Sequence, residues 1–116
     1  MFKIDKDNTI EMIDGDTGLL KIIFSNYELK TGDRLYLSAN NAQATRSNMM
    51  KSGYIFQKVV EVEEEGESIV ITIEPEDTKG VVGEYLYDVQ LTCENGYVDT
   101  IIPPSKMIIK RGVTNE

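Results

Sequence analysis

Carboxylates are plentiful in this chain, so an acid–base pair is the first chemistry to consider. Five of them gather in one short stretch, at Glu61, Glu63, Glu64, Glu65 and Glu67. A catalytic carboxylate pair needs two different environments, one of which raises the pKa of its group. Glutamates crowded on a polar tip repel one another and stay solvated, so their environments do not differ. We interpret the cluster as an exposed charged tip that opposes aggregation rather than as an acid–base pair.

A second set of oxygen-bearing side chains alternates along the N-terminal stretch, at Asp5, Asp7, Thr9 and Glu11. The spacing is superficially that of a calcium loop, but an EF-hand requires glycine at its sixth position and glutamate at its twelfth. Counted from Asp5, these positions hold Ile10 and Asp16. We therefore expect turn-forming hydrogen bonds and no dedicated metal site. Weak calcium binding through these oxygens is the alternative.

Nucleophilic and metal-assisted chemistry finds little support in the composition. The chain has no histidine and one cysteine, Cys93, so it lacks the commonest general base and cannot build a zinc site from Cys and His ligands. The neighbouring Glu94 disfavours a reactive thiolate, and we interpret Cys93 as structural. Nucleophile-elbow and phosphate-binding glycine motifs are also missing from the sequence. We predict that the protein is not an enzyme and binds no cofactor.

Charge and hydropathy restrict the classes of partner. Twenty acidic and twelve basic residues give a formal net charge of −8, which opposes binding to nucleic acid and to anionic membranes. No apolar run approaches the roughly 18 residues that span a bilayer. The opening sequence lacks the basic head and apolar middle of a secretory signal. We expect the protein to stay in the cell that makes it or to leave by lysis or assembly into a particle.

Contacts with other proteins are the chemistry that remains. The segment Ala39–Gly53 is polar and aperiodic, and we predict a loop that carries Met49 and Met50 as adaptable apolar contact residues. The alternative is that these methionines pack against the sheet beneath them. Tyr97, beside a predicted turn, is the third contact candidate, because tyrosine joins an apolar body to a polar tip.

The elements that would position these residues are clearest from Glu74 to Ile101. In this stretch one strand face carries the expected core residues Tyr85, Tyr87, Val89 and Leu91. Asn95-Gly96 predicts a two-residue type I′ hairpin turn. Gly83-x-Tyr85 predicts a tyrosine corner in a central strand, with Tyr85 largely buried and its hydroxyl bonded to backbone in the connection 77–83.

Further short strands follow from runs of apolar and β-branched residues. We expect one or two strands in residues 2–13, a buried strand at 19–24, a strand at 34–38, paired strands at 54–62 and 67–73 around the exposed acidic tip, and a last strand at 107–109. Pro103-Pro104 predicts an interruption at a sheet edge. The seven to nine short strands predict one all-β domain over residues 1–116, an antiparallel immunoglobulin-like β-sandwich.

The order of several motifs resembles a known family. These motifs are Gly15-Asp16-Thr17, Asp77-Thr78, Gly83-x-Tyr85-x-Tyr87-Asp88-Val89-Gln90-Leu91, Asn95-Gly96-x-Val98-x-Thr100-Ile101 and Val113-Thr114. The order is similar to that of small phage and prophage proteins of Gram-positive bacteria, especially the N-terminal domain of upper baseplate proteins. The resemblance implies an immunoglobulin-like sandwich that serves as an assembly module in a tail or baseplate.

Two hypotheses about function follow from these expectations. The first is a non-enzymatic structural protein of a phage or prophage particle, located in the virion or in the cytoplasm of the bacterial host. Its partners would be other phage structural proteins, or further copies of itself in a homo-oligomer. The second is a ligand-binding module for adhesion or carbohydrate binding. Neighbouring tail, capsid or lysis genes would favour the first, and sugar-processing genes the second.

Overall fold

The computed structural model describes residues 1–41 and 54–114, and Met49 and Met50 therefore lie outside the described residues. Strands dominate the described part of the chain, and one four-residue helix accompanies them. The elements are β1 (Phe2–Ile4), β2 (Ile10–Ile13), β3 (Gly18–Ile23), β4 (Arg34–Asn41), β5 (Phe56–Glu61), β6 (Ser68–Ile73), α2 (Pro75–Thr78), β7 (Gly83–Thr92) and β8 (Val98–Lys110). None of the described helical residues forms a segment long and apolar enough to cross a membrane.

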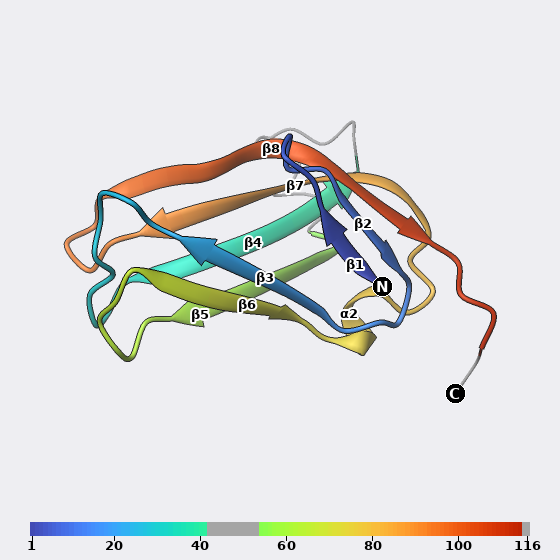
Figure 1. Ribbon diagram of the computed structural model, residues 1–116, viewed down its shortest axis with the longest axis horizontal. Coiled ribbons are helices and arrows are strands. Elements are labelled where there is room, and N and C mark those ends of the chain that lie inside the picture. The colour runs from blue at the N-terminus through green and yellow to red at the C-terminus, as the bar shows by residue number, and fades with distance from the viewer. Residues whose placement is uncertain (42–53, 115–116) are drawn as a thin grey trace.

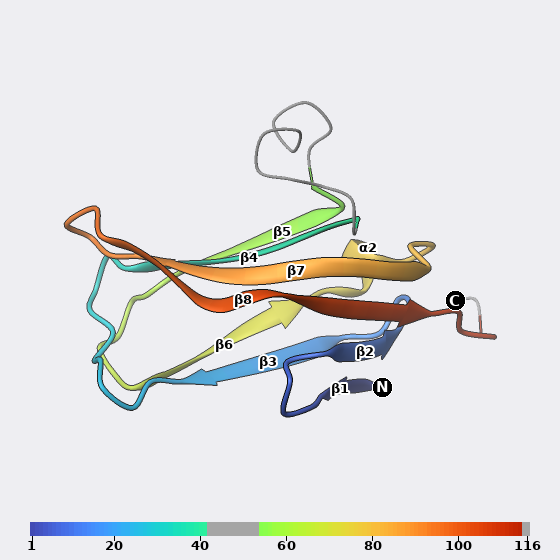
Figure 2. The same cartoon turned by 90° about the horizontal axis from the view of Figure 1, so that it is seen from above.

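The strands form two sheets (Figure 1). The larger sheet has six strands in the order β1-β2-β8-β7-β4-β5, and the smaller sheet pairs β3 with β6. All neighbours are antiparallel except β2 and β8, which run parallel with Ile10 opposite Met107. Figure 2 shows β3 and β6 in a separate layer from β4, β5 and β7. The prediction of an all-β fold is confirmed, and the expectation of purely antiparallel pairing is wrong.

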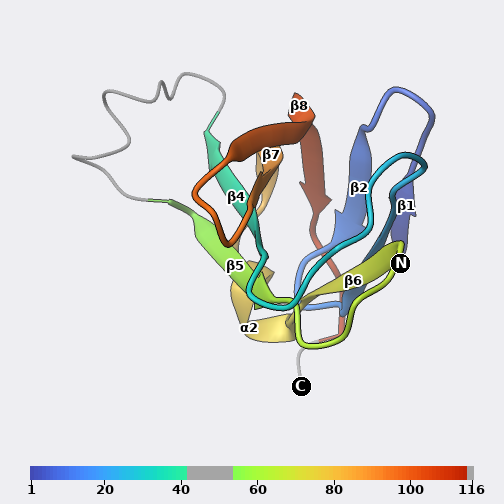
Figure 3. The same cartoon turned by 90° about the vertical axis from the view of Figure 1, so that its left-hand side faces the viewer.

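The core lies between the two sheets, because each sheet turns one set of alternating side chains inward. Residues from both sheets join in one cluster of buried apolar side chains, including Leu35, Leu37, Ile71, Tyr87 and Val89. Seen end-on, the larger sheet curls around the smaller one (Figure 3). The curl lets a sheet of six strands share one core with a sheet of only two.

The strand β7 lies between β8 and β4, as expected for the Tyr85 strand. The Tyr85 hydroxyl donates to the carbonyl of Val82 at 3.0 Å, which confirms the predicted bond to the preceding connection. A Cβ atom at Gly83, whose φ is +145°, would lie 3.3 Å from this hydroxyl, so the corner requires glycine there. Tyr85 itself is partly buried and packs against the edge of the core cluster, so its ring does not enter the core completely. Tyr87 fills the core instead, and its hydroxyl donates to the carbonyl of Asn8.

The turn at Asn95-Gly96 differs from the predicted type I′ turn. Gly96 has φ +93°, whereas Asn95 does not have a positive φ. Gly96 N donates to the Cys93 carbonyl at 2.8 Å, and Cys93 N donates to the Tyr97 carbonyl at 2.7 Å. The loop is therefore a β-turn followed by a glycine in the left-handed region, the three-residue alternative for the same residue pair.

Residues 54–62 and 67–73 contain the expected strands β5 and β6, but these strands do not pair with each other. β5 pairs with β4, and β6 pairs with β3. Val62 N still donates to the backbone carbonyl of Asp33 at 2.8 Å, and Gly66 then exchanges backbone hydrogen bonds with Leu29. The chain thus crosses from one sheet to the other within the acidic tip, and the predicted hairpin is wrong.

Three other expectations about strands also need correction. Residues 39–41 belong to β4 rather than to the predicted loop. β3 is buried on one face only, because nothing in the described chain covers the other face, and Ile23 there is 70% exposed. Pro103 and Pro104 interrupt no strand, since β8 runs through them at a shift of register opposite Asp88. At this level β8 borders β7 alone, because β2 reaches only Met107–Lys110, so the prolines do lie at an edge.

Candidate partner-binding site

Tyr97 is the predicted contact residue that the structure describes. It lies in the β7–β8 turn, where its side chain is 58% exposed. Every residue from 94 to 100 is exposed, so the tip of this hairpin extends beyond the core at one end of the molecule (Figures 1 and 2). Val98, 52% exposed, adds a second apolar side chain to the same tip. Val98 was not among the contact residues predicted from the sequence, although its place next to the turn was a usable signal.

The tip is held by a buried carboxylate, Asp33, which is 1% exposed. Its Oδ1 accepts from the backbone N–H of Glu94 at 3.1 Å. Its Oδ2 accepts from the Tyr27 hydroxyl at 2.6 Å and from the N–H of Lys30 at 3.0 Å. One carboxylate therefore joins the β3–β4 connection to the base of the β7–β8 turn.

The electrostatics of this cluster follow from its hydrogen bonds. Burial alone would raise the pKa of Asp33, but the bonds from Tyr27, Lys30 and Glu94 outweigh it and hold that pKa below its usual range. The hydrogen bond to Asp33 raises the pKa of the Tyr27 hydroxyl, and its contact with Cys93 raises it further. The network therefore keeps a charged carboxylate and a neutral phenol at neutral pH.

Cys93 takes part in the same cluster. Its Sγ lies 3.4 Å from the Tyr27 hydroxyl, and its side chain is half-buried. Its described hydrogen-bonding neighbour is thus a neutral phenol rather than a cation, and Glu94 follows it in the chain. This environment fits the structural role predicted for Cys93.

The acidic tip lies at the same end of the molecule. Glu63, Glu64 and Glu65 are all exposed, as expected for a solvated charge cluster. The carbonyl of Glu63 accepts from the Thr31 hydroxyl at 3.4 Å. The exposed glutamates show no pair of contrasting environments, which an acid–base mechanism would need. This end of the molecule thus offers Tyr97 and Val98 beside a strongly negative surface.

A second carboxylate junction, which was not predicted from the sequence, holds the opposite end of the molecule. Asp14 follows β2, and its Oδ1 accepts from Gly112 N at 2.7 Å while its Oδ2 accepts from Gly80 N at 3.0 Å. The hydrogen bonds from Gly112 and Gly80 are the main reason that the pKa of Asp14 lies below its usual value. The adjacent Gly15 N donates to the buried Thr78 hydroxyl at 2.9 Å. The glycine after Asp14 signals a turn, but no local pattern in the sequence signals this junction.

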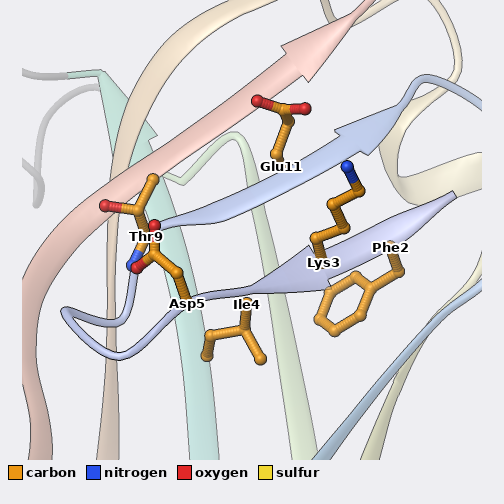
Figure 4. Close-up of a pocket in the computed structure, with 6 residues that line it drawn as sticks. All are labelled: Phe2, Lys3, Ile4, Asp5, Thr9 and Glu11. Carbon is orange, nitrogen blue, oxygen red and sulfur yellow. The ribbon is translucent and has the colours of Figure 1, made fainter.

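An open pocket of about 520 Å³ lies against β1 and β2 (Figure 4). Its lining comes from Phe2, Lys3, Ile4, Asp5, Thr9 and Glu11. Phe2 and Ile4 point to one side of β1, and Lys3 and Glu11 to the other, so these side chains do not converge on one point. The Glu11 carboxylate already pairs with Lys110 at 3.4 Å.

The aspartates beside this pocket act in the β1–β2 turn. Asp5 Oδ1 accepts from the N–H groups of Asp7 and Thr9, both at 3.1 Å, and Asp7 Oδ1 accepts from Thr9 N at 3.0 Å. These are the turn-forming bonds expected from the sequence. In the described ranges 1–41 and 54–114, no three His, Cys, Asp or Glu side chains are grouped to hold a metal ion.

Comparison with known proteins adds no family assignment. No protein-family model matches the chain, and no curated protein matches it.

Proposed function

We propose that the chain is a non-enzymatic assembly module of a phage or prophage particle, acting through protein–protein contacts in a tail or baseplate. The observation that carries the contact role is the β7–β8 tip. It presents Tyr97 and Val98 to solvent, and the buried Asp33 fixes the base that supports them. A rigid aromatic side chain at an anchored tip binds a partner at low cost in conformational entropy. The phage context rests on the sequence resemblance alone.

The proposal includes an immunoglobulin-like sandwich. The neighbours β8, β7 and β4 correspond to strands G, F and C of that fold, and the pair β3–β6 corresponds to strands B and E. The tyrosine corner at the start of β7 supports the same correspondence. In this fold the loops at the two ends of the sandwich are the usual contact surfaces, which agrees with a role for the tip.

Particle composition tests the proposal directly. Particles purified from the phage or induced prophage that carries the gene should contain the chain in a fixed stoichiometry, measured by quantitative mass spectrometry. Particles that lack the chain would overturn the proposal. Saturable binding to a glycan array, with the chain absent from particles, would favour the carbohydrate-binding alternative.

Two variants then test the tip. Tyr97→Ala combined with Val98→Ala should reduce incorporation of a folded chain into particles, because both exposed apolar contacts are lost. Val113→Ala is the control, since Val113 is an exposed apolar residue that lies after β8 and away from the tip. Equal incorporation of the double variant and the control would remove the tip from the contact surface.

A further inference from the structure

The smaller sheet has two open edges, because it consists of β3 and β6 alone. The N–H of Phe24 donates to the Glu67 carbonyl at 2.7 Å, and the register continues from this pair to Ile22 opposite Ile69. In an antiparallel ladder, hydrogen-bonded pairs alternate with non-bonded pairs. It follows that Ile69, Ile71 and Ile73 bond to β3. The other β6 residues, Ser68, Val70 and Thr72, turn their backbone N–H and C=O groups outward.

The outward groups of Ser68, Val70 and Thr72 have no backbone partner within the described residues. Unpaired groups of this kind are a template for another strand, and natural proteins protect them with short strands, lysines, prolines, bulges or inward-pointing charges. A strand edge without any of these features is therefore free to accept a strand of a partner.

Every other open edge in the described structure carries such protection. β1 has three residues, and Lys21 lies in the middle of β3. The open stretch of β8, which β2 does not reach, contains Pro103 and Pro104 beside a register shift. β5 carries Lys58, which points inward and pairs with Asp77 at 3.0 Å.

β6 carries none of these devices. Its sequence, SIVITI, is uncharged, contains no proline or glycine, and pairs with β3 in unbroken register over all six residues. On the outer face Val70 is 45% exposed. β6 therefore combines strong β propensity with an unguarded edge.

The charges at the two ends of β6 select the partner. Glu63, Glu64, Glu65 and Glu67 precede the strand, and Glu74 and Glu76 follow it. A second copy that paired antiparallel through β6 would place the acidic end of one strand beside the acidic end of the other. Like charges in such positions are destabilising. A strand with basic ends would meet opposite charges at both.

We propose that β6 binds an extended segment of a partner protein by strand addition, and that this segment has an uncharged β-branched centre with Lys or Arg at both ends. Backbone hydrogen bonds to Ser68, Val70 and Thr72 supply the affinity, and the acidic flanks select the basic ends. The inference rests on the proposed role in protein–protein contact and assigns to it a second surface, separate from the β7–β8 tip.

A synthetic peptide tests the chemistry of the partner. The probe has six alternating Thr and Val residues with two Lys at each end, and its control has Glu in place of every Lys. Amide resonances of isotopically labelled protein should shift in a saturable way at Ser68, Val70 and Thr72. We expect the Lys peptide to bind at least about tenfold more tightly than the Glu peptide, and this difference to shrink in high salt. Absent saturation, equal affinities, or shifts confined to β5 would overturn the proposal.

Proline variants test the edge itself. Val70→Pro removes an outward N–H without removing a bond to β3, and Thr72→Pro is a second variant of the same kind. The matched control is Val59→Pro in the edge strand β5. Val62 N bonds to the backbone carbonyl of Asp33, so alternation along β5 turns the N–H of Val59 away from β4 as well. Both β6 variants should weaken binding of the Lys peptide at least about tenfold, and the control should not. Unchanged binding by folded β6 variants would overturn the proposal.

Two further outcomes separate this inference from the proposed function. Self-association of the unmodified protein that Val70→Pro abolishes would show a second copy on the edge and would overturn the peptide assignment. Normal incorporation of Val70→Pro into particles would contradict the edge and leave the assembly role standing. Peptide binding at β6 by a chain that is absent from particles would support the strand-addition site and overturn the proposed assembly role.

Discussion

The two ends of the molecule are each held together by one aspartate, but the two aspartates differ in burial. At the β7–β8 end, Asp33 is almost completely buried and accepts three hydrogen bonds. At the other end, Asp14 is half-buried and accepts two, from Gly80 and Gly112. The same chemistry, a carboxylate that collects backbone N–H groups from distant segments, thus operates in a dry site and in a wet one.

The comparison teaches how burial changes the consequence of losing such a group. Water can replace the carboxylate at Asp14, because the site is open to solvent. At Asp33 water has little access, so donors that lose their acceptor stay unsatisfied. The tip that carries Tyr97 consequently depends on one residue more strongly than the opposite end does.

Asp33→Asn should have the largest effect. The amide keeps one acceptor oxygen but turns an NH₂ group toward donors that Asp33 now satisfies, so the free energy of unfolding should fall by about 2–4 kcal/mol. Urea unfolding at neutral pH measures the loss. The companion variant Tyr27→Phe, which removes one donor and leaves both backbone bonds, should cost only about 1 kcal/mol. Equal losses for the two variants would contradict the central place of Asp33.

The second-largest effect should be a loss of folding stability in acid. The pKa values of Asp33 and Asp14 are both lowered in the folded state, so their stabilising effect is complete above the unfolded pKa of about 3.9. It is lost as the pH falls through the lower folded values, because the folded state must then take up protons onto bonded oxygens. The melting temperature, measured from pH 7 to pH 2, should begin to decrease once the pH is lower than about 4. The decrease should be shallower in Asp33→Asn. An unchanged slope in that variant would show that other groups govern acid unfolding.

Asp14→Asn should have a smaller effect than Asp33→Asn, because solvent reaches the site. Hydrogen exchange gives the sharper measurement here: the amides of Gly80 and Gly112 should exchange faster in the variant, while that of Glu94 should not change. The reverse pattern is expected for Asp33→Asn. A variant of either residue that loosens both ends equally would mean that the two junctions are coupled through the core.

The sequence predicted the parts of this arrangement that depend on local pattern. Alternation along β7 placed Tyr87 and Val89 in the core, and the Gly83-x-Tyr85 spacing predicted the hydrogen bond that the Tyr85 hydroxyl makes. The acidic tip was expected to be exposed, and Glu63 and its neighbours are.

What the sequence did not predict depends on contacts between distant segments. β5 and β6 look like a hairpin because they are adjacent in the chain. In the structure, however, Val62 bonds to the backbone of Asp33 and Gly66 bonds to that of Leu29, so the chain leaves the larger sheet before β6 begins. The Asp14 junction joins residues up to 98 positions apart, and no local pattern signals such a bond. The same limit hid the open edge of β6, since an edge exists only once the neighbours of every strand are known.

Tyr97→Ser should have the smallest effect on stability, and it sharpens the comparison between the ends. The Tyr97 ring is largely exposed, and the bonds at this position are made by its backbone, through its carbonyl to Cys93 and its N–H to the Asn95 side chain. Serine keeps both, so the free energy of unfolding should change by less than about 0.5 kcal/mol. Urea unfolding checks this, with Asp33→Asn measured beside it. If Tyr97→Ser cost as much as Asp33→Asn, the ring would belong to the structural support of the tip rather than to its contact surface, and the proposed role of Tyr97 in binding a partner would fail.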